Sequence, residues 1–392
     1  MVKAKGKAGA KSAGFCMYIG PSIVGTIQQA RILYGDKQDA LAQISAAVEK
    51  YPLIATLVIP GDQVSEARIK VKTPDAFLIR PRSLDRRRKG GYSMKQELSG
   101  IIVPILTPLD AQENVDEARL RRQVDFVIEG GVNGILLFGS NGEFYMTEED
   151  EMAHCLDVVL GQTAGRVPVY FGIGAIRTGK CIRLAKMAQD HGADAISVLQ
   201  PMFLKPTEDE LYLHFRSIAE SAPELPMLLY NNPGRTGYTL SANLVERLAD
   251  VANIAGMKDS SGDLTQTEEF IRRTADKDFR VFAGKDTLIY ASLCVGAAGA
   301  VCTTANFLPE LVSEIYRSYR AGDTKASLAA QFRLNPIRLS MDKASFPVAT
   351  KDMANMRGMD VGVPYRPNLP TPDGPAYQAM LHELKKAGYI TD

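Results

Sequence analysis

From Ile101 onward, short runs of apolar, often β-branched residues alternate with stretches whose apolar positions recur every three or four residues. Runs of the first kind predict strands, and stretches of the second kind predict amphipathic helices. The predicted strands are Ile101–Leu106, Gly134–Phe138, Val167–Phe171, Ala195–Leu199, Pro226–Tyr230, Ile254–Lys258, Arg280–Ala283 and Gly299–Cys302. The predicted helices include Asp116–Glu129, Thr147–Val159, Gly179–His191, Glu208–Ser221 and Leu264–Thr274.

This alternation predicts the fold class. Eight strand–helix units at roughly 30 residues each favour parallel strands with right-handed crossovers, closed into a (β/α)8 TIM barrel. An open, doubly wound α/β sheet is the rival arrangement, but it rarely needs eight strands. We expect the barrel to span residues 94–322, with a C-terminal helical extension over residues 323–392.

The chain ahead of the barrel follows a different pattern. Residues 37–50 have apolar residues at helical spacing, Leu53–Ile59 is a strand-like run, and Val64–Val71 predicts a second short helix. Residues 1–80 are therefore predicted to form a small, basic α/β segment of unknown role. Residues 81–93 are charged, contain glycine and lack periodicity, which is typical of a linker.

Charge differs between these parts of the chain. Residues 1–93 hold 16 Lys and Arg against 7 Asp and Glu, whereas residues 94–392 hold 30 against 38. The barrel is therefore not a polyanion binder by charge, and a nucleic-acid partner is not expected. The basic front segment could touch nucleic acid or an acidic surface, but a solubilising tail is the favoured interpretation.

The cysteine and histidine content indicates the cellular compartment and bears on metal binding. The five cysteines form no CxxC pair, which favours reduced thiols and a cytoplasmic protein. The four histidines are far apart and form no HExxH motif, so no metal site and no cofactor are predicted. No apolar run approaches the roughly 18–20 residues of a membrane span.

Candidate chemistry lies at the ends of the predicted strands. Catalytic groups of a TIM barrel lie at the C-terminal ends of its strands, so residues distant in sequence can meet at one mouth. Lys258 ends strand six, Tyr230 ends strand five, and the turn Gly139–Glu143 follows strand two. A lysine held among apolar neighbours can present a neutral amine that attacks a ketone. An ordinary lysine at a strand end is the alternative.

Two loops add further groups. The turn after strand two carries a hydroxyl at Ser140 and an amide at Asn141 between two glycines, which is suited to an anion but also typical of a plain βα turn. The loop Tyr230-Asn-Asn-Pro-Gly-Arg-Thr-Gly237 places Arg235 five residues after a tyrosine. An arginine can hold a carboxylate by two parallel hydrogen bonds.

These motifs resemble those of the dihydrodipicolinate synthase / N-acetylneuraminate lyase family. The resemblance rests on Gly-Ser-Asn-Gly-Glu, Tyr-Asn-x-Pro-x-Arg-Thr-Gly and Gly-Met-Lys-Asp-Ser-Ser-Gly-Asp in this order and spacing. Residues 284–286 and 299–306 match as well. It covers about residues 97–392 and leaves residues 1–93 unexplained.

The resemblance implies a Schiff-base enzyme acting on pyruvate or another 2-oxo acid. Lys258 would form the imine, Tyr230 would donate and accept protons, and Ser140 would pass protons to Tyr230. Asn141 and the backbone near Val301 would hold the 2-oxo acid, and Arg235 would bind the carboxylate of the second substrate. Family members are usually homotetramers, which implies the same assembly here.

The pattern leaves the reaction open between two candidates. Arg235 favours a synthase that condenses pyruvate with aspartate semialdehyde in lysine biosynthesis, resembling 4-hydroxy-tetrahydrodipicolinate synthase. Phe203 stands where synthases carry a tyrosine that reaches in from a neighbouring subunit, and Asn141 where they usually carry threonine. Both favour an aldolase that cleaves a 2-keto-3-deoxy sugar acid or 4-hydroxy-2-oxoglutarate. A third hypothesis is a barrel without catalytic activity.

Overall fold

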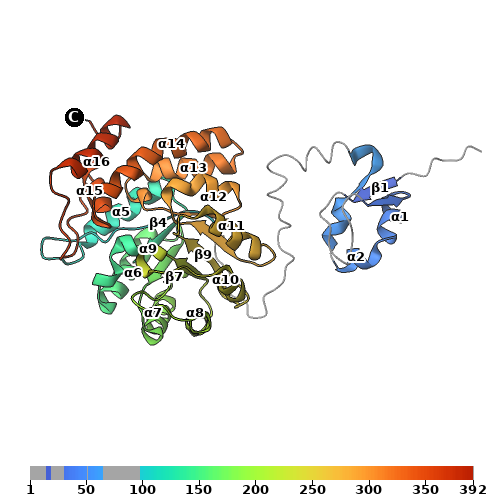
Figure 1. The fold of residues 1–392 in the computed structure, drawn as a ribbon, viewed down its shortest axis with the longest axis horizontal. Helices are drawn as coiled ribbons and strands as arrows, with labels where there is room; N and C mark the ends of the chain where they lie inside the picture. The colour runs from blue at the N-terminus through green and yellow to red at the C-terminus, as the bar shows by residue number, and fades with distance from the viewer. Residues whose placement is uncertain (1–14, 19–30, 51, 65–97, 392) are drawn as a thin grey trace, which may run out of the picture. The chain divides into compact units, whose positions relative to one another are not determined.

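The computed structural model describes residues 15–18, 31–50, 52–64 and 98–391 (Figure 1). The chain falls into two units, Met1–Arg87 and Arg88–Asp392. The predicted linker at 81–93 and the first four residues of the predicted barrel lie outside the described residues. The domain boundaries drawn from the sequence therefore stay a prediction.

The first unit contains a small antiparallel sheet. Its strands are β1 (Phe15–Tyr18), β2 (Ile32–Tyr34) and β3 (Val58–Pro60), in the order β2-β1-β3. The helices are α1 (Lys37–Ala42) and α2 (Ser45–Lys50), with 3-10 helices at Pro52–Leu57 and Gly61–Gln63. A small apolar core joins these elements: Cys16, Tyr18, Leu33, Ala40, Ile44, Ala47, Ile54 and Val58.

Local predictions for this unit were partly wrong. The helix expected over residues 37–50 is two helices, separated at residues 43–44. The strand expected at Leu53–Ile59 is a 3-10 helix through Leu57, and only Val58 and Ile59 belong to a strand. A short apolar run fits a buried turn of helix as well as a strand, so periodicity alone could not separate them. Beyond Val64, the helix expected at Val64–Val71 lies outside the described residues.

The second unit is the predicted TIM barrel. Its eight parallel strands close in the order β10-β11-β4-β5-β6-β7-β8-β9. Every predicted strand is confirmed, with ends shifted by at most two residues. Their bounds are β4 Gly100–Pro104, β5 Gly134–Leu137, β6 Val169–Ile173, β7 Ala195–Leu199, β8 Met227–Asn231, β9 Ile254–Asp259, β10 Arg280–Ala283 and β11 Gly299–Val301.

Helices surround these strands (Figure 1). The five predicted helices are confirmed to within four residues at each end. The helices up to the last strand–helix unit are α5 Glu117–Glu129, α6 Glu149–Thr163, α7 Thr178–Asp190, α8 Glu208–Ser221, α9 Pro233–Thr236, α10 Ala242–Leu248, α11 Leu264–Arg273, α12 Ile289–Cys294 and α13 Pro309–Arg320. Short 3-10 helices follow strands at Ser140–Gly142, Phe144–Met146, Asp286–Leu288 and Thr304–Asn306.

The barrel interior is filled by side chains from every strand. The inner cluster comprises Leu98, Ile102, Leu136, Tyr170, Ala195, Leu228, Ala255, Phe282 and Val301. Successive residues of a strand point to opposite sides. Tyr230 therefore lies on the same side of β8 as Leu228, one step nearer the C-terminal end of the strand. Because side chains fill the barrel interior, a reaction site is expected at the C-terminal mouth.

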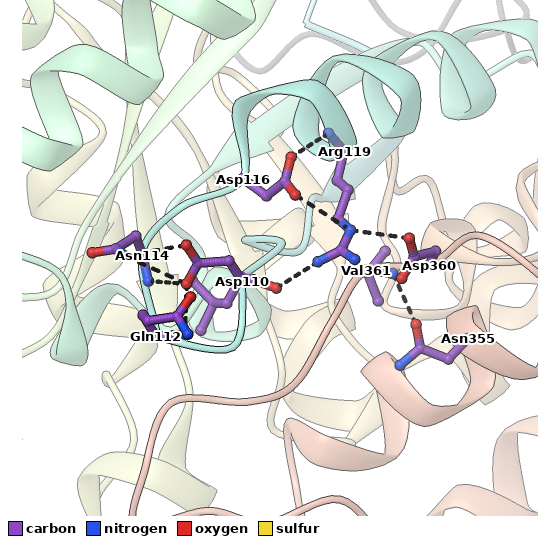
Figure 2. A network of polar contacts seen from close by, with 9 residues as sticks. Asp110, Gln112, Asn114, Asp116, Arg119, Asn355, Asp360 and Val361 are labelled. Atoms are coloured by element: carbon purple, nitrogen blue, oxygen red, sulfur yellow. Dashed lines mark hydrogen bonds and ion pairs between the residues drawn. The ribbon is translucent and has the colours of Figure 1, made fainter.

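The C-terminal extension is helical, as predicted, with α14 (Thr324–Ser340), α15 (Val348–Met356), α16 (Pro375–Lys386) and a 3-10 helix at Met341–Lys343. Figure 2 shows how the segment after α15 is fixed to the barrel: Arg119 donates from Nε to Asp360 at 3.0 Å and from Nη1 to the Leu109 carbonyl at 2.9 Å. Gly362 has φ +75°, and a Cβ there would lie 1.9 Å from the Leu109 carbonyl oxygen. The chain passes too close to the barrel for any other residue at this point.

Candidate active site

Lys258 and Tyr230 lie side by side at the barrel mouth. They are paired across the neighbouring strands β8 and β9, so the sheet register itself brings them together. Lys258 is only 5% exposed, and its Nζ lies 4.2 Å from the centre of the Tyr230 ring. The amine is thus held against an aromatic face and away from bulk water, as a buried nucleophile requires.

Polar groups surround the phenol of Tyr230. Asn232 donates from Nδ2 to the phenol oxygen at 2.8 Å, and the Ser140 hydroxyl lies 3.5 Å from it. Burial alone would raise the pKa of Tyr230, but the charge of Lys258 opposes this effect. Hydrogen bonds from Ser140, Asn232 and Ser260 act in the same direction as Lys258, and the pKa of Tyr230 lies below its ordinary value. A phenol tuned in this way is suited to proton transfer.

Ser140 and Asn141 lie in a 3-10 turn directly after β5. Within this turn the Gly142 amide donates to the Gly139 carbonyl, and the Glu143 amide donates to the Ser140 carbonyl. The amides of Gly142 and Glu143 are therefore used within the turn itself. The side chains of Ser140 and Asn141, both buried, are the groups that this turn offers to a ligand.

The amide of Asn141 is held at both ends. Its Nδ2 donates to the Thr303 hydroxyl at 3.0 Å, and its Oδ1 accepts from the Thr350 hydroxyl at 3.0 Å. Thr303 is held in turn by Asp286, whose carboxylate accepts the Thr303 amide at 3.2 Å and the Thr304 amide at 2.7 Å. The turn after β5, the loop after β11 and helix α15 therefore meet at the Asn141 amide, and Asp286 holds the second of these in place.

Glu143 ends the same turn in a left-handed conformation, with φ 52°. Its carboxylate lies 2.7 Å from the amine of Lys351 on α15, and both side chains are fully buried. The Tyr365 amide donates to the other carboxylate oxygen at 3.2 Å. Burial lowers the pKa of Lys351, and Glu143 only partly opposes this effect. The pair fixes the C-terminal extension to the turn that carries Ser140.

Arg235 lies apart from the buried centre, on α9, with its side chain exposed. Its guanidinium stacks over the ring of Phe346 at 4.5 Å. Partial burial raises the pKa of Tyr145 to about 12, Glu143 adds to the rise, and the positive charge of Arg235 opposes it. Arg235 and Phe346 thus form a stacked cation–aromatic pair that joins α9 to the segment before α15.

Val301 ends β11, and its side chain belongs to the inner barrel cluster. The next residue, Cys302, is fully buried, and burial together with Asp286 raises the pKa of its thiol. The positive charge of Lys258 opposes that rise. The family resemblance predicts that the backbone near Val301 holds the 2-oxo acid.

Phe203, in the loop after β7, has φ 74° and a side chain that is 96% exposed. A large aromatic residue is rarely held in this way in an isolated barrel, because both the backbone conformation and the exposure are unfavourable. The loop therefore presents an apolar side chain outward beside the mouth, together with the exposed Leu204.

Sequence reasoning missed several of these groups. Asn232 and Ser260 each lie two residues after a predicted site residue, so the alternation of strand side chains could have found them. Thr303 lies in a stretch that was quoted only as a match to the family. Phe346, Thr350 and Lys351 come from the C-terminal extension, where no local pattern marked them.

In the described parts of the chain, no group of three or more His, Cys, Asp and Glu side chains is placed to hold a metal ion. Over the same residues, none of the helices combines the length and apolar character needed to cross a membrane.

Comparisons with known proteins identify the family and agree with the fold. The profile of the Dihydrodipicolinate synthetase family matches residues 97–387. The 4-hydroxy-tetrahydrodipicolinate synthase of Methanopyrus kandleri is 34% identical over 298 residues, which is 76% of this chain and 98% of the relative. A crystal structure of dihydrodipicolinate synthase from Bacillus anthracis superposes with a TM-score of 0.71 at 32% identity, covering 74% of this chain and 98% of that one.

A second solved structure carries a ligand. YagE, a prophage protein of the dihydrodipicolinic acid synthase family from E. coli K12, was solved in complex with pyruvate. It matches with a TM-score of 0.72 at 28% identity, over 75% of this chain and 100% of that one. The chain is thus similar over most of its length to 4-hydroxy-tetrahydrodipicolinate synthases, which are lyases, and it belongs to the dihydrodipicolinate synthetase family.

Proposed function

We propose that this enzyme condenses pyruvate with aspartate semialdehyde through a Schiff base on Lys258, as a 4-hydroxy-tetrahydrodipicolinate synthase of lysine biosynthesis. The observation that carries the proposal is the buried Lys258 amine against Tyr230, with Ser140 beside the phenol. The similarity to a synthase from Methanopyrus kandleri and to a pyruvate-bound relative supports the same chemistry.

Lys258 and Tyr230 carry the first half of the reaction. The lone pair of Nζ attacks the ketone carbon of pyruvate, and the carbonyl oxygen takes up a proton from Tyr230. One proton of the attacking amine passes through Tyr230 to the resulting hydroxyl, which leaves as water while the nitrogen lone pair forms the C=N bond of the protonated imine. The imine withdraws electrons, so the phenolate left on Tyr230 takes a methyl proton and an enamine forms. No oxidant or reductant is consumed.

The enamine then forms the new carbon–carbon bond. Its terminal carbon attacks the aldehyde carbon of aspartate semialdehyde, and the aldehyde oxygen takes a proton, which Ser140 relays through Tyr230. Water, or the amino group of the bound substrate, releases the product from Lys258. Asn141 and the backbone near Val301 hold the 2-oxo acid, and Arg235 holds the carboxylate of the aldehyde by paired hydrogen bonds.

Borohydride trapping tests the Schiff base directly. Incubation with pyruvate and borohydride should add one reduced pyruvate to the protein, and peptide mapping should place it on Lys258. The Lys258→Arg variant keeps a positive charge but should take up no label. Absence of label on the native chain would reject the Schiff base and favour a barrel without catalytic activity.

The alternative is an aldolase that cleaves a 2-keto-3-deoxy sugar acid or 4-hydroxy-2-oxoglutarate. Phe203 favours it, because it has no hydroxyl to join a proton relay, and Asn141 favours it as well. Both reactions use the same imine, so trapping does not separate them. Initial rates with pyruvate plus aspartate semialdehyde, compared with cleavage of 2-keto-3-deoxygluconate, decide between the two.

Assembly and location belong to the same proposal. The outward-facing Phe203 and Leu204 beside the mouth support contact with a second copy, within a homotetramer. All five cysteines are free, which supports a reducing cytoplasmic compartment. Solution mass from light scattering tests the assembly, and a monomeric mass at working concentration would reject it.

A further inference from the structure

Thr350 lies far from the site in sequence and beside it in space. It belongs to α15, and its fully buried hydroxyl donates to the Asn141 side chain at 3.0 Å. The next residue on the helix, Lys351, forms the buried ion pair with Glu143, which lies two residues after Asn141. Helix α15 thus holds the turn after β5 at two points.

The second contact of Asn141 fixes which way its amide faces. Nδ2 donates to the Thr303 hydroxyl, and Thr303 is anchored by Asp286 through its backbone amide. A primary amide has two N–H groups. Among the described residues Nδ2 makes this one hydrogen bond, so its second N–H stays available to a ligand.

We propose that Thr350 is a positioning residue that orients the Asn141 amide toward the carboxylate of the 2-oxo acid. The inference rests on the proposed function, in which Asn141 holds this carboxylate. With the Thr350 hydroxyl donating to Oδ1, the carbonyl of the amide is turned toward α15 and the N–H groups are turned away from it. Without that donor the carbonyl is left buried and unpaired, and the amide can rotate to present oxygen to the negative substrate.

The expected consequence is a change in binding rather than in chemistry. The carboxylate of pyruvate carries the same charge before and after imine formation. A contact to it therefore stabilises ground state and transition state alike, and its loss raises KM with little effect on kcat.

The test is the pyruvate concentration that gives half-maximal borohydride labelling of Lys258. Thr350→Val keeps the shape of the side chain and removes its hydroxyl, and it should raise this concentration about five- to tenfold. Thr350→Ser keeps the hydroxyl and should stay within about twofold of the native protein. Labelling at saturating pyruvate and KM for aspartate semialdehyde should be unchanged in both.

A double-mutant cycle separates positioning from a general packing effect. If Thr350 acts through Asn141, then introducing Thr350→Val into the Asn141→Ala chain should raise the half-saturating pyruvate concentration by less than about twofold. Two outcomes would overturn the inference while the Schiff base stands. In the first, the half-saturating pyruvate concentration of Thr350→Val lies within about twofold of the native value. In the second, Thr350→Val raises this concentration by the same factor in the native chain and in the Asn141→Ala chain. If the native chain takes up no label, the proposed function and this inference fail together.

Folding of the variants is checked by thermal unfolding. Should Thr350→Val fail to fold, Thr350→Ala removes the same hydroxyl without adding volume, and the same shift in half-maximal labelling is expected from it. If the half-saturating pyruvate concentration of Thr350→Ala equals that of the native protein, the inference is wrong.

Discussion

Glu143 and Lys351 form a fully buried ion pair with 2.7 Å between carboxylate and amine, although 208 positions separate them in the chain. Glu143 ends the turn after β5 that carries Ser140, and Lys351 lies on α15. Because neither charge reaches water, each depends on the other for its stability in the fold.

Removing one partner should be costly. We expect Lys351→Met to lower the free energy of unfolding by about 3–5 kcal/mol, because it leaves the Glu143 carboxylate buried without a cation. Urea unfolding followed by circular dichroism measures the change. The matched variant Glu143→Gln/Lys351→Met removes both charges and should recover most of the loss. A single variant within about 1 kcal/mol of the native protein would contradict this account of the pair.

Tyr230→Phe isolates the role of the phenol. The change leaves the ring that covers Lys258 and removes only the hydroxyl, so kcat should fall about a hundred- to ten-thousandfold. Steady-state rates with pyruvate and aspartate semialdehyde report it. Tyr238→Phe is the matched control: this buried tyrosine donates to the Pro201 carbonyl at 2.8 Å, and its loss should leave kcat nearly unchanged. Equal effects of the two changes would argue against proton transfer by Tyr230.

The charge of Lys258 should be visible in the titration of Tyr230. Lys258 lowers the pKa of this phenol, while burial raises it. Lys258→Met removes the opposing charge, so Tyr230 should ionise at higher pH than in the native protein. Ultraviolet absorbance of tyrosinate, taken as the difference between each protein and its Tyr230→Phe counterpart, isolates this one phenol. An unchanged or lower pKa would show that the lysine charge does not act on it.

Phe346 should matter for the second substrate and not for pyruvate. Its ring lies under the Arg235 guanidinium at 4.5 Å, a contact worth about 0.5–1 kcal/mol at an exposed site. Phe346→Leu removes the aromatic face at similar volume and should raise KM for aspartate semialdehyde about two- to fivefold. Phe346→Tyr keeps the face and should restore the native value. A rise in half-saturating pyruvate instead would place Phe346 in a different role.

His214 gives the protein a pH-dependent stability away from the site. It lies buried on α8 with Nδ1 2.9 Å from the Thr178 hydroxyl, and burial lowers its pKa to about 4 from 6.5. Between these two values the unfolded chain binds a proton that the folded chain does not. Stability is therefore full above about pH 6.5 and falls by about 3 kcal/mol as the pH drops toward 4.

Urea unfolding at about pH 7.5 and about pH 4.5 measures this difference. His214→Gln should reduce it, whereas the exposed His382→Gln should not. If both variants keep the pH dependence of the native chain, another group is responsible for it.

The amino-acid sequence determined the barrel and the centre of its candidate site. The spacing of apolar residues in each strand and helix is a local property that can be read from the sequence. Eight successive strand–helix units can be arranged in only a few ways, and a closed barrel is one of them. Lys258, Tyr230 and Ser140 could be predicted together because the ends of parallel strands converge, whatever the side chains around them. Arg235 was also found from sequence, but not its stacking partner.

Only the tertiary structure showed which residues of the C-terminal extension contact the turns at the barrel mouth. Thr350 meets Asn141 across 209 positions, and the period of α15 indicates a helix without indicating which strand end it covers. The antiparallel sheet of the first unit was likewise hidden, because its strands are three or four residues long. Contacts between distant segments depend on packing of the whole fold, which no local pattern of apolar and polar residues records.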